Sequence, residues 1–284
     1  MPTLPPLLRA SHPGPTVAVT AVATALSASA GLGARSVAVA AAFLSGQLSV
    51  GWSNDWVDAA RDRAVDRRDK PVVQGALRVA TVRTAALLAL LACVPLSLLV
   101  GTWAGAAHLV AVASAWQYNA HLKSTALSWA PYAVSFGLVP SIAVLGLPGH
   151  PLAPAWATAG GALLGVGAHL ANVLPDLADD AATGVRGLPH RLGHRRSALL
   201  AGVALVGATA LLALGPGYDG RGALAVLVAG GVFAAGLRRG TAFGAAIVVA
   251  LLDVGLLVIR GGSLVLHRKP GVTAGAWCDS GSLV

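Results

Sequence analysis

An apolar run of this chain ends in the acidic segment Asn54-Asp55-Trp56-Val57-Asp58-Ala59-Ala60-Arg61-Asp62. Only 11 residues of the chain are acidic, and eight of these lie in this stretch, its continuation and a second copy 118 residues later. The two copies share residue types at seven matched positions: Asn54, Asp58, Asp62, Arg68, Pro71, Gly75 and Arg78 correspond to Asn172, Asp176, Asp180, Arg186, Pro189, Gly193 and Arg196. Recurrence of such scarce residues at fixed spacing indicates one site built from two parts of the chain.

The composition indicates an integral membrane protein. The 284 residues are 56% hydrophobic and 11% charged, whereas soluble globular domains have roughly 25% charged residues. The formal net charge of +9 would suggest nucleic acid in a soluble chain. In a membrane protein it is better explained by topology, because basic residues gather in cytoplasmic loops. We therefore predict membrane lipid around the chain and no nucleic-acid partner. The two cysteines, Cys93 and Cys278, have no spacing typical of a disulfide framework or a metal site.

Apolar runs between Gly, Pro and charged residues predict the helices that cross the membrane. We expect an all-α membrane domain over residues 1–260, with about nine transmembrane helices around a central cavity, and a mobile tail over residues 261–284. The nine predicted spans lie near 16–32, 37–53, 82–100, 104–119, 127–147, 154–173, 198–214, 222–237 and 241–259.

The loops that follow the even-numbered spans fix the expected orientation. They hold 14 of the 20 basic residues, whereas the opposite loops hold only Arg35 and Arg221. The spans 37–53 and 154–173 run directly into the two acidic copies, so both motifs should face the same side. The positive-inside rule then predicts that the motif loops and the N-terminus are cytoplasmic. We expect the membrane to be the cell membrane. The exceptions to this pattern follow the ninth span: Arg260, Arg268 and Lys269.

The spacing within each motif predicts a shared polar cavity. On a helix, positions i, i+4 and i+8 lie on one face, and each copy places an Asn and two Asp there. Two such faces turned toward each other would hold four carboxylates and two amides, which repel one another without cations. Oxygen ligands of this kind suit Mg²⁺, which prefers a few carboxylates together with water and substrate phosphate. The predicted metal ligands are Asn54, Asp58, Asp62, Asn172, Asp176 and Asp180.

Basic residues just beyond each motif favour a phosphorylated ligand. Arg68 with Lys70, and Arg186 with Arg191, are placed to bind phosphate oxygens that the metal leaves free. The alternative, salt bridges on a solvated loop, accounts for Asp66 and Asp69 but not for the recurring Asn and Asp positions. His190 lacks accompanying His or Cys ligands, so we expect it in an interfacial loop.

The paired motifs resemble those of the UbiA superfamily of intramembrane prenyltransferases. The first family signature, NDxxDxxxD, is matched by Asn54, Asp55, Asp58 and Asp62, and the following basic-Pro-Gly segment by residues 68–75. The DxxxD core of the second signature is matched by Asp176 and Asp180, followed by Gly184, Leu188-Pro189 and Arg191-Leu192-Gly193. A further aspartate that many members carry upstream is absent, and Val173 or His169 stands in its place. Tyr118 to Lys123 resembles a family segment between helices four and five.

The resemblance implies a site with two Mg²⁺ ions and an isoprenyl diphosphate. Asp58, Asp62, Asp176 and Asp180 would be catalytic through the metal, and Arg68, Lys123, Arg186 and Tyr118 would contact the diphosphate. The diphosphate would leave with Mg²⁺, and a small acceptor, aromatic or lipophilic, would attack the allylic carbocation. A UbiA-like terpene cyclase and a non-enzymatic transporter remain as alternatives.

Overall fold

The computed structural model describes residues 4–265, apart from the side chains of residues 178 and 179. Within this range the chain is helical and contains no strand. The long helices of the described range, one for each predicted span, are α2 (Pro13–Ser29), α3 (Ser36–Ala64), α4 (Val79–Val100), α5 (Thr102–Ala120), α6 (Ala130–Leu145), α7 (Ala155–Val173), α10 (His194–Leu214), α11 (Gly220–Arg239) and α12 (Ala242–Ile259).

Short helices connect the long ones. They are α1 (Pro6–Arg9), α8 (Leu177–Ala182) and α9 (Leu188–Leu192), with 3₁₀ turns η1 (Gly33–Arg35), η2 (Leu122–Ser124), η3 (Leu174–Asp176) and η4 (Gly261–Leu264). In η4, Gly261 and Leu264 are buried, and a Cβ on Gly261 would lie 2.5 Å from Ser29 Oγ on α2. The expected mobile tail therefore cannot start at residue 261, because these residues pack on the bundle; residues 266–284 lie outside the described range.

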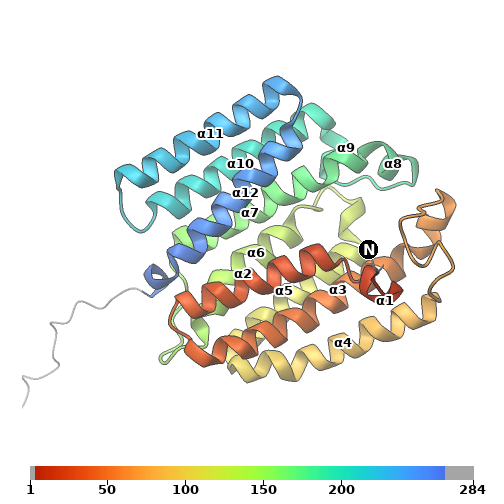
Figure 1. Ribbon diagram of the computed structural model, residues 1–284, viewed down its shortest axis with the longest axis horizontal. Coiled ribbons are helices and arrows are strands. Elements are labelled where there is room, and N and C mark those ends of the chain that lie inside the picture. The colour runs from red at the N-terminus through yellow and green to blue at the C-terminus, as the bar shows by residue number, and fades with distance from the viewer. Residues whose placement is uncertain (1–3, 266–284) are drawn as a thin grey trace, which may run out of the picture.

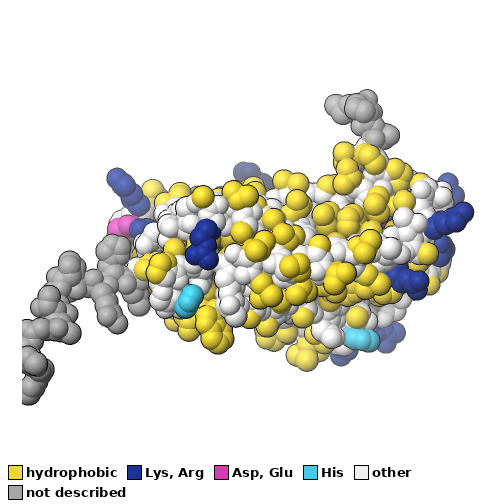
Figure 2. All heavy atoms as spheres, turned by 90° about the horizontal axis from the view of Figure 1, so that it is seen from below, with side chains coloured by type: hydrophobic (Ala, Val, Ile, Leu, Met, Phe, Trp, Pro, Cys, Tyr) yellow, Lys and Arg dark blue, Asp and Glu magenta, His cyan; other side chains and the backbone are white. Residues whose placement is uncertain are grey.

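The helices present apolar side chains to the outside as well as to the core. Leu91 on α4, Leu227 on α11 and Leu251 on α12 are 69%, 72% and 66% exposed, and Figure 2 shows hydrophobic side chains over the middle of one face with most Lys and Arg toward the two ends. Such a surface is costly in water and normal in lipid. In the described range, six helical segments are long and apolar enough to cross a membrane, which makes the chain an integral membrane protein. The expectation of about nine crossings stays a prediction.

The long helices form two groups that meet at α6 and α7 (Figure 1). In one group α7, α10, α11 and α12 pack together; in the other α2 and α4 pack against α3, and α4 and α6 pack against α5. The loop after α3 and the segment α8–α9 lie at the same end of the molecule (Figure 1). The two acidic motifs therefore face the same end.

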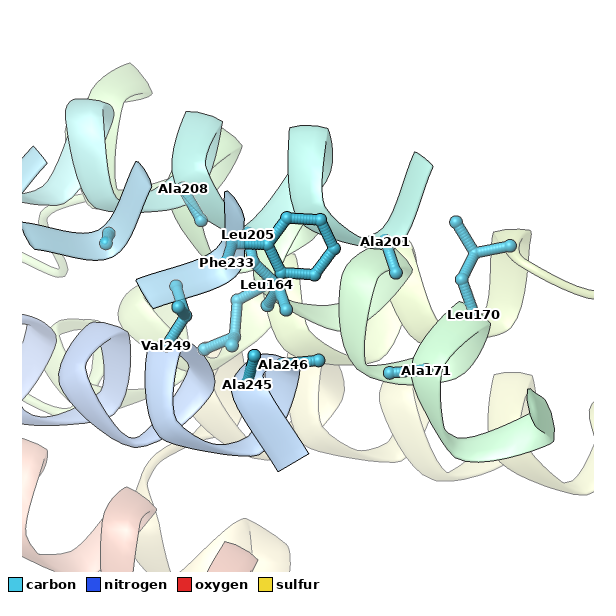
Figure 3. Packing of buried hydrophobic residues seen from close by; sticks show 11 residues of the cluster. Leu164, Leu170, Ala171, Ala201, Leu205, Ala208, Phe233, Ala245, Ala246 and Val249 are labelled. Carbon is cyan, nitrogen blue, oxygen red and sulfur yellow. The ribbon is translucent and has the colours of Figure 1, made fainter. Parts of the chain in front are cut away.

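Small residues bring the helices of the first group close together. Phe233 of α11, which Figure 3 labels, lies against Gly202 of α10, where a Cβ would be 1.8 Å from the ring. Gly202 thus leaves the space that Phe233 fills. Buried Leu164 of α7 and Leu205 of α10 belong to the same apolar cluster.

Glycines of α7 also set its distance from α6. A Cβ on Gly161 would lie 2.6 Å from the carbonyl oxygen of Phe136, and one on Gly165 would lie 2.4 Å from that of Tyr132. Because the neighbouring atoms are backbone, the helices approach as closely as small-residue contacts allow in membranes.

Arg35 and Arg260, which lie away from the motif end, have local structural roles. Arg35 donates to the carbonyl oxygens of Gly146 (2.8 Å) and Val100 (2.9 Å), which end α6 and α4. Arg260 lies 3.1 Å from Asp219, the residue that caps α11. Basic side chains near helix C-termini satisfy unpaired carbonyls. Each of these arginines therefore has a structural role that explains its position outside the loops at the motif end.

We predict that Gly165→Ala forces α6 away from α7 and lowers the free energy of unfolding by about 1–3 kcal/mol. Gly231→Ala is the matched control, because Gly231 lies on the exposed face of α11 with nothing within 4 Å of an added Cβ. The control should be neutral or slightly stabilising. Thermal unfolding in detergent measures both, and equal midpoints for the two variants would contradict the close backbone contact.

Candidate active site

A cavity of about 550 Å³ lies inside the bundle and is lined by residues of α2, α3, α5, α6, α7 and α8. Along α3 the lining side chains follow one another roughly every turn, from apolar to acidic: Phe43, Gln47, Val50, Asn54, Asp58 and Asp62. This face covers roughly 28 Å of helix at 1.5 Å per residue. The cavity therefore has an acidic mouth at the end of α3 and an apolar interior.

Side chains of α5 follow the same gradient. His108 contacts Phe43 in the apolar interior, with ring centroids 4.3 Å apart. Asn119, eleven residues later, lies 3.4 Å from Asn54 at the mouth. The gradient is thus a property of the whole cavity and suits a ligand with a charged head and an apolar tail.

The structure places all six predicted oxygen ligands on the wall of this one cavity. The first three lie on α3, which continues as a single helix through the motif to Ala64. Asn54 donates its Nδ2 to Asp58 Oδ2 (3.2 Å) and toward Asn119 Oδ1 (3.4 Å). Asn119 is itself oriented by its bonds to Val50 O (2.9 Å) and Ser53 Oγ (2.8 Å). The network leaves Asn54 Oδ1 as the atom that is available to a cation.

The second motif does not lie on one helical face, contrary to the prediction. Helix α7 ends at Val173, the chain passes through the 3₁₀ turn η3 at Pro175, and α8 begins at Leu177. Proline cannot donate the backbone hydrogen bond that would continue α7, so the spacing i, i+4, i+8 loses its helical meaning. Asn172, Asp176 and Asp180 reach the cavity from three successive elements: α7, η3 and α8.

The carboxylates of the mouth differ in their partners. Asp58 Oδ1 is paired with both Arg61 and Lys123. Among the described residues, the side chains of Asp62 and Asp176 accept no hydrogen bond and form no ion pair. Burial raises the pKa of the Asp180 carboxyl, and His190 opposes that shift.

No three His, Cys, Asp or Glu side chains within the described residues converge into a ready-made metal site. The oxygens stand apart around the mouth, and several are uncommitted. This arrangement fits Mg²⁺, which takes one or two carboxylates and completes its shell with water and phosphate oxygens. It does not fit a metal that needs a full protein cage.

Two of the predicted diphosphate ligands lie outside the cavity. The Arg68 side chain is 83% exposed and donates to Asp66 at 2.6 Å. Arg186 is exposed as well, and its carbonyl oxygen accepts a bond from Arg191. Both residues lie in irregular loops, where sequence spacing does not determine side-chain direction.

Other basic residues line the cavity instead. Lys123 does so, together with Arg61, Arg67 and Lys70. Burial lowers the pKa of the Lys123 ammonium, an effect that the Asp58 carboxylate opposes. Arg67 is held by Asp69 through bonds of 3.0 and 3.1 Å. The mouth thus mixes uncommitted carboxylate oxygens with several cations, as a diphosphate with metal requires.

Aromatic side chains line the cavity next to the mouth. Tyr118, also predicted to contact diphosphate, meets Tyr132 at a ring distance of 5.1 Å, nearly perpendicular. Tyr132 is stacked with Phe136 and lies 4.7 Å from the ring of His169. Nothing in the motif spacing indicated Tyr132 or Phe136, since only the packing of α6 on α5 and α7 brings them here.

His190 also belongs to the site rather than to an interfacial loop. Its side chain is 6% exposed, lines the cavity and places Nε2 3.5 Å from Asp180 Oδ2. The expectation was wrong because α9 turns back over the mouth. Leu188-Pro189 at the start of α9 could have indicated this turn, because Pro is favoured in the first turn of a helix.

Asp55, although part of the acidic motif, does not line the cavity. Its carboxylate lies 2.5 Å from Lys70 Nζ and 3.0 Å from His12 Nε2. Trp52 Nε1 donates to the carbonyl oxygen of Leu7 at 2.8 Å. These contacts fasten the N-terminal segment, residues 4–12, across α3 at the mouth.

A family model described as the UbiA prenyltransferase family matches residues 15–257. The chain belongs to this family. No protein of curated function matches the sequence significantly. Residues of both acidic motifs line one cavity of this integral membrane protein. This is the arrangement that the resemblance to the superfamily implied.

Solved structures share the fold at low sequence identity. A digeranylgeranylglyceryl phosphate synthase is 15% identical over 91% of this chain and 97% of its own, with a TM-score of 0.65. A UbiA homolog from Archaeoglobus fulgidus bound to DMAPP and Mg²⁺ is 15% identical over 90% and 99%, with a TM-score of 0.66. The apo UbiA homolog from Aeropyrum pernix K1 is 17% identical over 85% and 97%, with a TM-score of 0.65. At these identities the likeness concerns the fold.

Proposed function

We propose that this protein transfers a prenyl group from an isoprenyl diphosphate to a small acceptor in a Mg²⁺-dependent reaction that releases diphosphate. The observation that carries the proposal is the cavity itself, which joins an acidic mouth with nearby cations to an apolar interior inside a membrane bundle. The mouth matches a diphosphate with metal, and the interior matches a hydrocarbon tail. Archaeoglobus fulgidus UbiA homologs bound to DMAPP or GPP with Mg²⁺ support this choice of donor.

The acidic residues of the mouth would hold two Mg²⁺ ions. Asn54 Oδ1, Asp62 and Asp58 would supply oxygens from α3, and Asn172, Asp176 and Asp180 would supply them from the facing elements. Asp58 would be freed for this role when Lys123 turns toward the diphosphate. When bound, Mg²⁺ supplies Lewis-acid charge that neutralises a departing diphosphate.

Basic and tyrosine side chains at the mouth would bind and orient the isoprenyl diphosphate. Lys123, Arg61 and Arg67 would bind diphosphate oxygens, and Tyr118 would donate to the same group. The allylic C–O bond then breaks, with its electron pair going to the diphosphate oxygen. The acceptor bonds to the allylic carbon through an electron pair of its own, and the proton that it loses goes to the released diphosphate or to water. Tyr132 and Phe136 line the cavity behind the mouth and exclude water, which would otherwise trap the cation.

The motif end should face the cytoplasm of the cell membrane. Most basic residues lie in loops at this end, and the two outlying arginines, Arg35 and Arg260, have local structural roles. An impermeant maleimide should label Ala76→Cys, next to the mouth, only from the cytoplasmic side. It should label Pro148→Cys, on the loop after α6, only from the outside; the reverse pattern would overturn the orientation.

We predict that Asp62→Asn and Asp176→Asn each lower Mg²⁺-dependent diphosphate release from geranyl diphosphate by about 100-fold or more. Asp66→Asn is the control, because Asp66 is exposed beside the same motif and does not line the cavity. Release is measured with purified protein, with and without EDTA and with and without a panel of acceptors. Near-normal release by either cavity variant would remove the metal assignment, and a hydrocarbon product without acceptor would indicate a cyclase.

We predict that Lys123→Gln raises the KM for geranyl diphosphate about 10- to 100-fold, because a charged hydrogen bond to the donor is lost. Arg68→Gln and Arg186→Gln should change this KM less than twofold, since neither residue lines the cavity. Steady-state kinetics gives the KM for geranyl diphosphate of each of the three variants. A larger effect at Arg68 than at Lys123 would contradict the arrangement of the mouth.

A further inference from the structure

His169 of α7 has one ring nitrogen without a partner. The residue is 1% exposed and lines the cavity beside the mouth. Its Nε2 lies 3.0 Å from Ser128 Oγ, whereas its Nδ1 is buried and has no hydrogen-bond partner among the described residues. A buried polar atom without a partner carries a desolvation penalty, so its retention calls for an explanation.

The surroundings of Ser128 determine which nitrogen of His169 carries the proton. Ser128 is fully buried, and its Oγ accepts a hydrogen bond from the backbone N–H of Leu188 at 2.9 Å. Among the described residues, His169 Nε2 is the one acceptor within reach of the serine proton. The serine proton has an acceptor among these contacts only if Ser128 donates to Nε2, and we assign this direction, which places the ring proton of the neutral imidazole on Nδ1.

This arrangement is rigid. The backbone of Gly187 packs against Ser128, where an added Cβ would lie 2.9 Å from the hydroxyl and 2.6 Å from the carbonyl oxygen of Lys123. The rings of Tyr132 and Tyr118 lie 4.7 and 5.7 Å from the imidazole. His169 Nδ1–H is thus a fixed, neutral donor enclosed by aromatic rings.

The surroundings of the His169 Nδ1–H differ from those expected of a group that binds the diphosphate. The cations of the mouth already serve a charged head group, whereas no basic side chain is paired with His169. A neutral N–H among aromatic rings suits an uncharged or delocalised oxygen. That oxygen belongs to the second substrate, which must reach the allylic carbon directly behind the diphosphate.

We propose that His169, fixed by Ser128, positions the prenyl acceptor by donating its Nδ1–H to an acceptor oxygen. The inference rests on the proposed prenyl transfer and adds the acceptor chemistry: the acceptor carries a hydroxyl, carbonyl or carboxylate oxygen near the atom that is prenylated. His169 keeps its proton throughout and acts as a positioning residue.

Two isosteric variants test whether His169 Nδ1–H acts as a hydrogen-bond donor to the acceptor. The amide of His169→Gln reaches about as far as Nε2 and keeps the contact with Ser128, whereas that of His169→Asn reaches about as far as Nδ1 and keeps the donor. With geranyl diphosphate, Mg²⁺ and a panel of phenols, quinols and glyceryl phosphate, His169→Gln should raise the acceptor KM about 10-fold. The donor KM should stay within twofold, and His169→Asn should recover most of the loss.

An unchanged acceptor KM in His169→Gln, or an equal rise in the donor KM, would overturn the inference. Absence of turnover by the unmodified protein would instead overturn the proposed function. Nitrogen-15 NMR of histidine-labelled protein in detergent tests the tautomer without any variant. A protonated Nδ1 for His169 supports the inference, and a proton on Nε2 overturns it.

Discussion

Negative charge at the end of an apolar helix is the constraint on which the rest of this structure depends. Placing an acidic group close to the hydrocarbon core of the membrane costs free energy unless cations or hydrogen bonds compensate its charge. Helix α3 carries Asp55, Asp58 and Asp62 within two turns, on two different faces. Asp55 is compensated by Lys70, and Asp58 by Arg61 and Lys123. The loops that supply Lys70 and Lys123 are thereby drawn over the end of α3, and their return creates the mouth of the cavity.

The same constraint separates the motif residues by role. Asp55 turns toward the N-terminal segment and is satisfied within the protein, so it holds the fold together. Asp62 and Asp176 stay uncommitted at the mouth, where a cation from solution can reach them. Within one acidic motif, Asp55 thus forms contacts within the protein whereas Asp62 lines the cavity, depending on the helical face that each occupies.

The helices and the pairing of the motifs could be predicted from the sequence, because both follow from short-range periodicity. Each apolar run overlaps a long helix, and Asn54 and Asp58 share the face that the i, i+4 spacing requires. The second motif departs from this face at Pro175, where the helix breaks. That Arg67 lines the cavity and its neighbour Arg68 does not could not be predicted, since loop side chains have no period. His169, Tyr132 and Phe136 needed the packing of three helices.

The N-terminal segment is held by residues that follow it in the chain, so it can be fastened only after they have been synthesised. His12 is synthesised 43 residues before Asp55 and 58 residues before Lys70. At ribosomal speed, the last partner emerges roughly 3–12 s after the first. The N-terminal segment must therefore wait, and the rim of the bundle at the motif end is completed only when the third partner has been made.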